Sequence, residues 1–232
     1  MRGFLLCILL ILGGFTLQAQ TYEIGGILGG SNYIGEVGKT NFIAPNNIAF
    51  GGIFKWNRSP RHSFRFTLIH TTLSGDDADA SDNRRIQRGY SFKNSLTEAS
   101  LGLEYTFWDF SMYSGKPAQA PYLYTGLTYF KYDALFRRPV VGDIVKYDDA
   151  YALAIPMVLG YKMTIGTKMV LGFEIGARYT FTDGLDGSNP PKGNRANNPN
   201  LKFGNINSDD WYVFTNMTLT FTFGRKPCYC NF

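Results

Sequence analysis

Hydrophobic and polar residues alternate along residues 210–223, near the end of the chain. The odd positions are almost all apolar, whereas the even positions become mostly polar toward the end of the segment. This period of two predicts a β-strand with two different faces. The segment has no Pro or Gly and no charge after Asp210, and at roughly 3.3 Å per residue it can cross a hydrocarbon layer at a tilt. We interpret it as the closing strand of a transmembrane β-barrel.

Seven earlier segments show similar alternation and complete the set of predicted strands. They are residues 21–28, 48–56, 63–73, 100–107, 122–132, 152–162 and 171–181. Both faces of residues 122–132 carry aromatic side chains, so the facing of that strand stays open. Pro156 cannot donate a hydrogen bond to a neighbouring strand, which predicts a local bulge there. The pattern predicts an all-β fold, an about eight-stranded antiparallel transmembrane β-barrel of the size of OmpA and OmpX.

The connections between the predicted strands alternate in length. Long polar segments at residues 29–46, 74–88, 133–149 and 183–208 alternate with shorter ones at residues 57–61, 109–120 and 165–168. Outer-membrane barrels have long extracellular loops, short periplasmic turns and an even number of strands. The alternation therefore predicts a place in the outer membrane of a Gram-negative cell, with both termini in the periplasm.

The first 20 residues have the features of a secretory signal peptide. Arg2 provides a positive start, residues 4–12 form an apolar run, and a small residue, Ala19, marks a cleavage site. The apolar run is too short to span a membrane as a helix. The expected organisation is a signal peptide over residues 1–20, an outer-membrane β-barrel over residues 21–224 and a periplasmic C-terminal tail over residues 225–232.

Composition adds little to this picture. Charged residues make up 18% of the chain, aromatic residues 16%, and there are 26 glycines, which suits a barrel with aromatic girdles. The net charge of +5 is too small and too scattered to indicate nucleic-acid binding. No glycine-rich motif is followed by a predicted helix, as a nucleotide site would require, and we expect no cofactor.

A set of ionisable residues falls on the polar faces of the predicted strands. These residues are Glu23, Lys55, Arg65, Glu104, Lys162, Glu174 and Arg178. In a barrel of about eight strands, that face meets in an interior that side chains just fill. Such charges can line a pore or a proton path, or can form a plug of mutually paired groups. The narrow interior favours the plug.

Other candidate chemistry is weak. His70 lies close in sequence to Ser74, Asp76 and Asp77, a combination that an outer-leaflet acyl-transferring enzyme would use. Catalytic roles depend on geometry, however, which sequence proximity does not provide. The acidic residues of segment 74–88 lack the central Gly and terminal Glu of a twelve-residue calcium loop. We expect a solvated loop there, no metal site and no enzymatic activity.

Cys228 and Cys230 give the C-terminal tail its unusual chemistry. A disulfide between them would close a small, strained ring, and strain makes a disulfide exchangeable. The periplasm oxidises thiols readily, and the predicted mature chain has no other cysteine. Three interpretations stay open: a local disulfide, a frayed end, and an intermolecular disulfide to another protein.

Six short segments carry a further resemblance. They are residues 23–25, 29–36, 104–107, 154–156, 182–186 and 210–212, with the sequences EIG, GGSNYIGE, EYTF, AIP, TDGLD and DWY. Together these segments resemble the PorG family of outer-membrane barrels. The similarity covers essentially the whole mature chain and includes loop residues that strand periodicity does not require. Glu36 stands where the family has Asp, and Gly184 and Gly187 stand where it commonly has Tyr and Asp.

The resemblance implies a non-enzymatic role in the type IX protein secretion and gliding machinery. It implies that the barrel anchors the periplasmic ring of the lipoprotein PorK and its partner PorN to the outer membrane. The turns at residues 57–61 and 165–168, and the tail with Cys228 and Cys230, would then contact the partners. The sequence alone leaves three alternatives: a free-standing structural or adhesive barrel, an outer-leaflet lipid-modifying barrel, and a soluble lipocalin with inverted strand faces.

Overall fold

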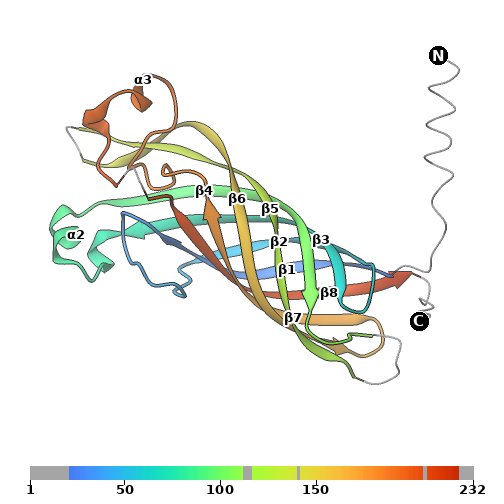
Figure 1. Ribbon diagram of the computed structural model, residues 1–232. Coiled ribbons are helices and arrows are strands. Elements are labelled where there is room, and N and C mark those ends of the chain that lie inside the picture. The colour runs from blue at the N-terminus through green and yellow to red at the C-terminus, as the bar shows by residue number, and fades with distance from the viewer. Residues whose placement is uncertain (1–20, 112–116, 140–141, 206–207, 225–232) are drawn as a thin grey trace, which may run out of the picture.

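The computed structural model describes residues 21–111, 117–139, 142–205 and 208–224 (Figure 1). Its strands are β1 (Thr21–Ile34), β2 (Asn47–Asn57), β3 (His62–Asp76), β4 (Ser91–Thr106), β5 (Gln119–Arg137), β6 (Ile144–Ile165), β7 (Met169–Thr180) and β8 (Trp211–Gly224). Short helical turns lie in the connections: η1 (Asp77–Asp79), α2 (Asn83–Arg88), α3 (Gly193–Ala196) and η2 (Pro199–Leu201). Within the described part of the chain, no helix is long and apolar enough to cross a membrane. The predicted signal peptide and the tail with Cys228 and Cys230 lie outside the described residues.

The eight strands form a closed antiparallel barrel (Figure 1). Each strand pairs with its neighbours in sequence, and β1 pairs with β8 to close the ring. The closing ladder runs from Thr21 opposite Gly224 to Ile34 opposite Trp211. A closed ring leaves no open sheet edge to pair with another chain. The predicted fold class, an eight-stranded antiparallel β-barrel, is confirmed.

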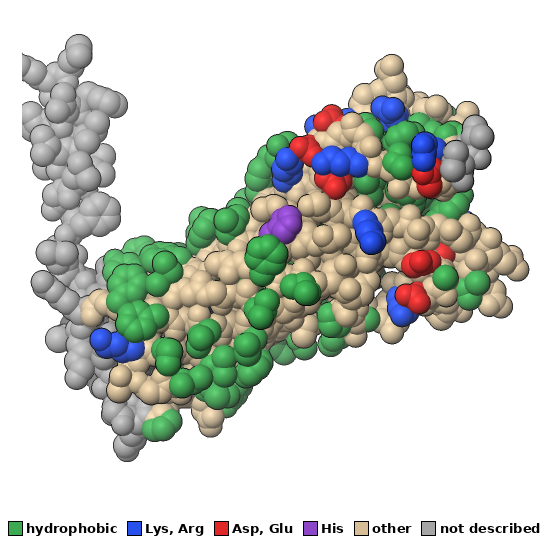
Figure 2. Space-filling model, turned by 180° about the vertical axis from the view of Figure 1, so that it is seen from behind, with side chains coloured by type: hydrophobic (Ala, Val, Ile, Leu, Met, Phe, Trp, Pro, Cys, Tyr) green, Lys and Arg blue, Asp and Glu red, His purple; other side chains and the backbone are tan. Residues whose placement is uncertain are grey.

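Side chains alternate between the outer wall and the interior along each strand. On β3, Phe64 and Leu68 point outward and are 46% and 50% exposed, whereas Arg65 and Thr67 point inward and are fully buried. Figure 2 shows hydrophobic side chains spread over the barrel wall, with most of the visible charges gathered toward one end. An apolar wall around an ionisable interior is the distribution of a membrane-spanning barrel. The inverted arrangement of a soluble lipocalin is therefore wrong for this chain.

The structure resolves the facing of β5. Tyr122, Tyr124 and Phe130 point into the barrel and are buried, whereas Leu123 and Leu127 lie on the outer wall. The outward face of β5 also carries an exposed tyrosine at position 129. Rings on both faces hide the alternation from a reading of the sequence, because a tyrosine suits either environment.

The bulge predicted at Pro156 is wrong. Pro156 lies opposite Arg178 of β7, and the register is the same on both sides of it. The ladder with β5 loses its pairs beside Pro156 and resumes in the same register. The register shift in that ladder lies between Ala134 and Leu135 instead. The proline, which lacks an N–H donor, is accommodated by missing ladder pairs and not by an inserted residue.

The two ends of the barrel differ, and we name them by their connections (Figure 1). The turn end carries the connections at residues 58–61, 107–118 and 166–168, together with the start of β1 and the end of β8. The loop end carries the connections at residues 35–46, 77–90, 138–143 and 181–210. Gly166, with a φ of 65°, forms the tight β6–β7 turn, where a residue with a side chain would be strained.

One predicted loop is mostly strand. Residues 133–149 were expected to form a loop, but β5 continues to Arg137 and β6 begins at Ile144. Charged residues on this hairpin pair across the two strands: Lys146 Nζ lies 2.6 Å from Asp133 Oδ1, and Lys131 Nζ lies 2.5 Å from Asp149 Oδ2. Cross-strand ion pairs thus replace the apolar alternation that marks the other strands.

The interior is divided into two layers. Toward the loop end, most inward side chains are apolar, and they form one cluster of buried residues that includes Ile69, Leu73, Leu96, Phe130 and Tyr212. Toward the turn end, most inward side chains are ionisable or hydroxyl-bearing. The polar face predicted from the sequence therefore does not extend along the full length of the barrel.

Candidate functional site

Five members of the predicted charge cluster form one network inside the barrel. Arg65 holds Glu174 through two parallel hydrogen bonds, with N–O distances of 2.8 and 2.9 Å. Lys55 and Lys162 both donate to Oε1 of Glu104, at 3.0 and 2.8 Å. Arg65 Nη1 also lies 3.6 Å from Glu104 Oε2, which joins the two groups. Side chains from five strands thus meet in one ionic layer.

Arg178, one of the two remaining members of the predicted set, forms a separate pair. Its Nη2 donates to Glu98 Oε1 at 2.9 Å, and the hydroxyl of Tyr212 donates to Glu98 Oε2 at 2.7 Å. The sequence prediction omits Glu98 because it begins this strand at Ser100, whereas β4 begins at Ser91. The inward positions continue without interruption from Ser100 back through Glu98, so a longer window of the same period-two pattern would have included it.

The charges in the barrel strands balance. The fully or nearly fully buried ionisable residues there are the cations Lys55, Arg65, Lys162 and Arg178 and the carboxylates Glu23, Glu98, Glu104 and Glu174. Aromatic rings fill the space between them: Tyr122 donates to Glu174 at 2.8 Å, and the Arg65 guanidinium lies 4.6 Å from the centre of the Tyr124 ring. Paired charges and rings form a plug, and this arrangement suits a barrel too narrow for an aqueous channel.

His70 does not join the carboxylates that follow it in the sequence. Its ring lies on the outer wall, with Nδ1 2.8 Å from Thr97 Oγ1 and the ring centre 5.5 Å from that of Phe50. Asp77 is buried at the loop end and binds Arg88 through two hydrogen bonds. No described contact assembles a nucleophile, base and carboxylate around His70, and the lipid-modifying interpretation loses its proposed site.

The loop end holds a second group of buried acids, which the sequence analysis did not identify as a site. We call Glu36, Asp183, Asp186 and Asp210 the acid cluster. One carboxylate oxygen from each of Glu36, Asp183 and Asp210 lies within 4.8 Å of the others. Asp186 and Asp210 are fully buried and Asp183 is 8% exposed. The four residues lie outside the strands, at the junction of the β1–β2 and β7–β8 connections.

Only some oxygens of the acid cluster have hydrogen-bond donors. The hydroxyl of Tyr33 donates to Asp210 Oδ1, and the backbone N–H of Leu185 donates to Asp210 Oδ2 at 2.9 Å. The backbone N–H of residue 188 donates to Asp186 Oδ1 at 2.8 Å. The remaining buried oxygens lack a hydrogen-bond partner: both of Asp183, Oδ2 of Asp186 and Oε2 of Glu36. Buried carboxylate oxygens without donors are costly.

Burial raises the pKa of every acid in the cluster, and the charges of neighbouring carboxylates add to the effect at Glu36, Asp183 and Asp210. For Asp183, burial has the largest effect, followed by the charges of Glu36 and Asp186, and together they raise its pKa to about 8, although the side chain of Asn189 opposes the shift weakly. Burial is also the main reason that the pKa of Asp210 lies well above its usual value, and it raises the pKa of Asp186 and Glu36. The site is therefore one where negative charge needs a counterion or a proton.

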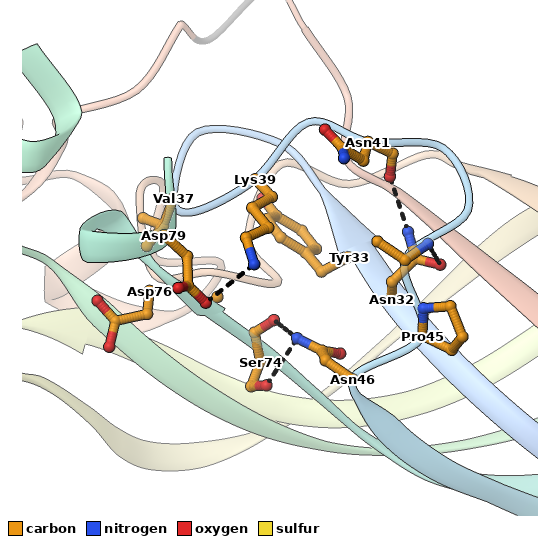
Figure 3. Close-up of a pocket in the computed structure, with 12 residues that line it drawn as sticks. Asn32, Tyr33, Val37, Lys39, Asn41, Pro45, Asn46, Ser74, Asp76 and Asp79 are labelled. Carbon is orange, nitrogen blue, oxygen red and sulfur yellow. Dashed lines mark hydrogen bonds and ion pairs between the residues drawn. The ribbon is translucent and has the colours of Figure 1, made fainter. Parts of the chain in front are cut away.

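The loop end also holds a pocket of about 250 Å³ with a mixed polar and apolar lining (Figure 3). It lies between the β1–β2 connection and the end of β3, and its lining includes Asn32, Tyr33, Lys39, Asn46, Ser74 and Asp79. Lys39 Nζ and Asp79 Oδ2 form an ion pair of 3.4 Å on one side of it. Tyr33 lines the pocket and also binds Asp210, so this side chain connects the pocket lining to the acid cluster.

The fold and the plugged interior define a small membrane-spanning β-barrel. The chain belongs to the family described as a domain of unknown function (DUF6089), whose model matches residues 2–232. None of the curated proteins matches this sequence.

Several solved structures share the barrel shape at low sequence identity. OprG from Pseudomonas aeruginosa is 10% identical, with a TM-score of 0.45 over 89% of this chain and 97% of that one. Ail, the attachment invasion locus protein of Yersinia pestis, solved with the heparin analogue sucrose octasulfate, is 8% identical, with a TM-score of 0.41 over 89% and 99%. A major outer membrane protein from Thermus thermophilus is 13% identical, with a TM-score of 0.41 over 88% and 100%. These similarities concern shape and extend to no functional property.

Proposed function

We propose that this protein is a non-enzymatic outer-membrane component of the type IX secretion system that anchors the periplasmic PorK/PorN ring. The resemblance to the PorG family supports the choice of partners, because it includes loop residues as well as strand residues. The plugged interior is the structural observation that carries the proposal. A barrel filled by paired charges has no room for a passing solute, so its function must lie at its ends or on its wall.

The apolar wall supports a place in the outer membrane. Outer-membrane barrels have an even number of strands, short periplasmic turns and both termini in the periplasm. The turn end of this barrel has the short turn at residues 166–168 and carries the start of β1 and the end of β8. On this proposal the turn end faces the periplasm and meets the ring.

The turn end is braced by contacts between its connections. Arg61 Nε lies 2.6 Å from Asp109 Oδ1, which links the β2–β3 turn to the β4–β5 connection. Trp108 donates from Nε1 to the carbonyl of Gln119 at 2.5 Å, yet its side chain is 48% exposed. Tryptophan and arginine are residue types that the energetically important positions of protein interfaces favour. We therefore place the ring contact at Arg61 and Trp108, with the tail as a second contact.

The tail supplies a possible covalent contact. Cys228 and Cys230 belong to the segment that follows β8, and a disulfide to a ring lipoprotein would tether the two proteins. Non-reducing gels of native envelopes test this part alone. A higher band that disappears with Cys228→Ser or Cys230→Ser supports the tether, and a monomeric band that neither substitution alters removes it.

Affinity purification from gently solubilised membranes tests the proposed function. Mass spectrometry of the co-purifying chains should find the two ring proteins with the wild type and lose them with the Arg61→Glu/Trp108→Ala variant. Arg84→Glu is the matched control, since its exposed side chain lies on α2 at the opposite end, and it should retain both proteins. Recovery of the wild-type barrel alone would instead favour the free-standing structural or adhesive barrel.

A further inference from the structure

The acid cluster has more carboxylate oxygens than donors to bind them. Asp183 and Asp186 are more than nine-tenths buried, and between them three oxygens lack a hydrogen-bond partner. The oxygens of Glu36, Asp183 and Asp210 nonetheless lie within 4.8 Å of one another. Like charges at such distances repel strongly in a buried site. The cluster therefore requires positive charge close to it.

The neighbouring arginines do not provide that charge through direct contact. Arg88 is bound to Asp77 at 2.8 and 2.9 Å and to the backbone carbonyl of Glu36 at 2.7 Å. Arg85 donates to the backbone carbonyls of Gly35 and Gly38, both at 2.9 Å. Among the described residues, no salt bridge joins either guanidinium to a carboxylate of the cluster. Both arginines hold the β1–β2 connection, and their charges act on Glu36 and Asp186 without a direct ion pair.

The geometry matches a calcium ion. Calcium binds carboxylate oxygens at roughly 2.3–2.6 Å, so ligands on opposite sides of the ion lie about 5 Å apart. Magnesium binds at roughly 2.0–2.1 Å and demands a near-ideal octahedron, a geometry that ligands from separate loops meet less readily than the flexible coordination of calcium. All of the carboxylate ligands in the cluster are oxygens. Oxygen ligands suit calcium and magnesium, whereas zinc and copper sites usually contain nitrogen or sulfur ligands.

We propose that the acid cluster is a calcium site, with Glu36, Asp183 and Asp210 as carboxylate ligands and Asp186 beside them. Glu36 belongs to the β1–β2 connection, Asp183 to the β7–β8 connection, and Asp210 immediately precedes β8. A bound ion therefore ties together two loops that are far apart in the sequence, above the ladder that closes the ring. This inference does not depend on the proposed role in secretion.

Titration of the purified mature chain in detergent tests the site directly. After removal of metals by a chelator, calorimetric titration with calcium chloride should give one ion per chain, with a dissociation constant at or below roughly 10⁻³ M. The dissociation constant for magnesium should be at least about tenfold higher than that for calcium. If no binding is detected at calcium concentrations well above roughly 10⁻³ M, the proposal is overturned. Protons shared among the carboxylates would then neutralise the cluster.

Variants connect the binding to the named residues. Asp183→Asn keeps the size of the side chain but removes its charge, and should weaken calcium binding about tenfold or more. The matched control is Asp79→Asn, an exposed acid at the same end that pairs with Lys39, and it should bind calcium like the wild type. Unchanged calcium affinity in Asp183→Asn would contradict the assignment, whatever the wild type binds.

Proteolysis gives a readout that does not depend on the variants. The β7–β8 connection carries three trypsin sites, at Lys192, Arg195 and Lys202. Calcium should slow cleavage at these sites severalfold in the wild type, because the ion holds that connection to the β1–β2 connection, and magnesium should not. Cleavage rates that are equal with calcium, with magnesium and with chelator would count against the site, even if the Asp183→Asn chain proves too unstable to titrate.

Discussion

Arg65 of β3 and Glu174 of β7, 109 residues apart in the sequence, form a bidentate ion pair across the barrel interior. The two strands lie on opposite sides of the eight-membered ring, so this pair spans its full width. Both side chains are nearly completely buried. Removal of one partner from this pair should therefore reduce the stability of the barrel strongly.

Replacement of Arg65 by methionine should destabilise the barrel by about 3–5 kcal/mol, because it leaves a buried carboxylate without its cation. The temperature at which the barrel loses its compact gel mobility measures this loss. The Arg65→Met/Glu174→Gln double variant should recover much of the stability, since no uncompensated charge remains. Equal losses in the single and double variants would show that packing, and not charge pairing, determines the effect.

Two inward tyrosines should differ in their contribution to stability. The hydroxyl of Tyr212 donates to the charged Glu98, and Tyr212→Phe should cost about 1.5–3 kcal/mol. The hydroxyl of Tyr124 contacts the neutral Ser100 at 2.6 Å, and Tyr124→Phe should cost about 0.5–1.5 kcal/mol. Urea midpoints of folding into lipid vesicles provide the comparison. A larger effect at Tyr124 would contradict this order.

A charge on the apolar wall should be costly. Leu101 points outward from the middle of β4 and is 62% exposed, so Leu101→Arg should destabilise the lipid-embedded barrel by about 2–4 kcal/mol if it lies near the membrane midplane. The control is Ile86→Arg on α2, which is 46% exposed at the loop end. Folding into vesicles should be impaired only by the first substitution. Equal tolerance of both would refute a membrane-facing wall.

The β3–β4 connection should loosen at low pH. Burial alone would raise the pKa of Asp77, but hydrogen bonds from Arg88 and from the backbone N–H groups of Gly38 and Tyr90 outweigh it and hold the pKa below its usual value. A lowered pKa in the folded state contributes stability at neutral pH, and this contribution is lost as the pH falls below about 4 and passes through the folded pKa.

Hydrogen exchange of the Gly38 and Tyr90 amides, corrected for intrinsic rates, measures this loss. In the wild type, protection of these two amides should decrease as the pH is lowered below about 4. Asp77→Asn should show weaker protection with little dependence on pH over the same range, because no carboxylate titrates. Wild-type protection that stays constant down to the lowest pH would exclude Asp77 as the responsible group.

Period-two alternation was sufficient to predict the ring and most of its facing. On β3 the sequence places Phe64 outside and Arg65 inside, and the structure has the same arrangement. The pattern depends only on backbone geometry and on the contrast between lipid and interior. It fails where the contrast fails: β5 has rings on both faces, and the hairpin around Arg137 and Ile144 has charges in place of apolar side chains.

The acid cluster could not be predicted in the same way. More than a hundred residues separate Glu36 from Asp183, and most of the β7–β8 connection separates Asp183 from Asp210. No short sequence motif therefore contains all three. Their proximity follows from the pairing of β1 with β8, which brings the connection after one strand beside the connection before the other. All four acids of the cluster lie in the sequence segments from which the PorG-like family was predicted, but a sequence resemblance does not show which residues are close together in space.

The closing ladder has a consequence for biogenesis. Thr21 begins the barrel and Gly224 ends it, yet the two residues face each other across one pair of strands. A chain exported from its N-terminus therefore leaves the first strand unpartnered on one side until the last has arrived, and during that interval the unpartnered backbone must be shielded from aggregation. Joining these two ends by a short linker and cutting the chain at the turn containing Gly166 would yield a circular permutant with the same set of strand neighbours and a different order of synthesis.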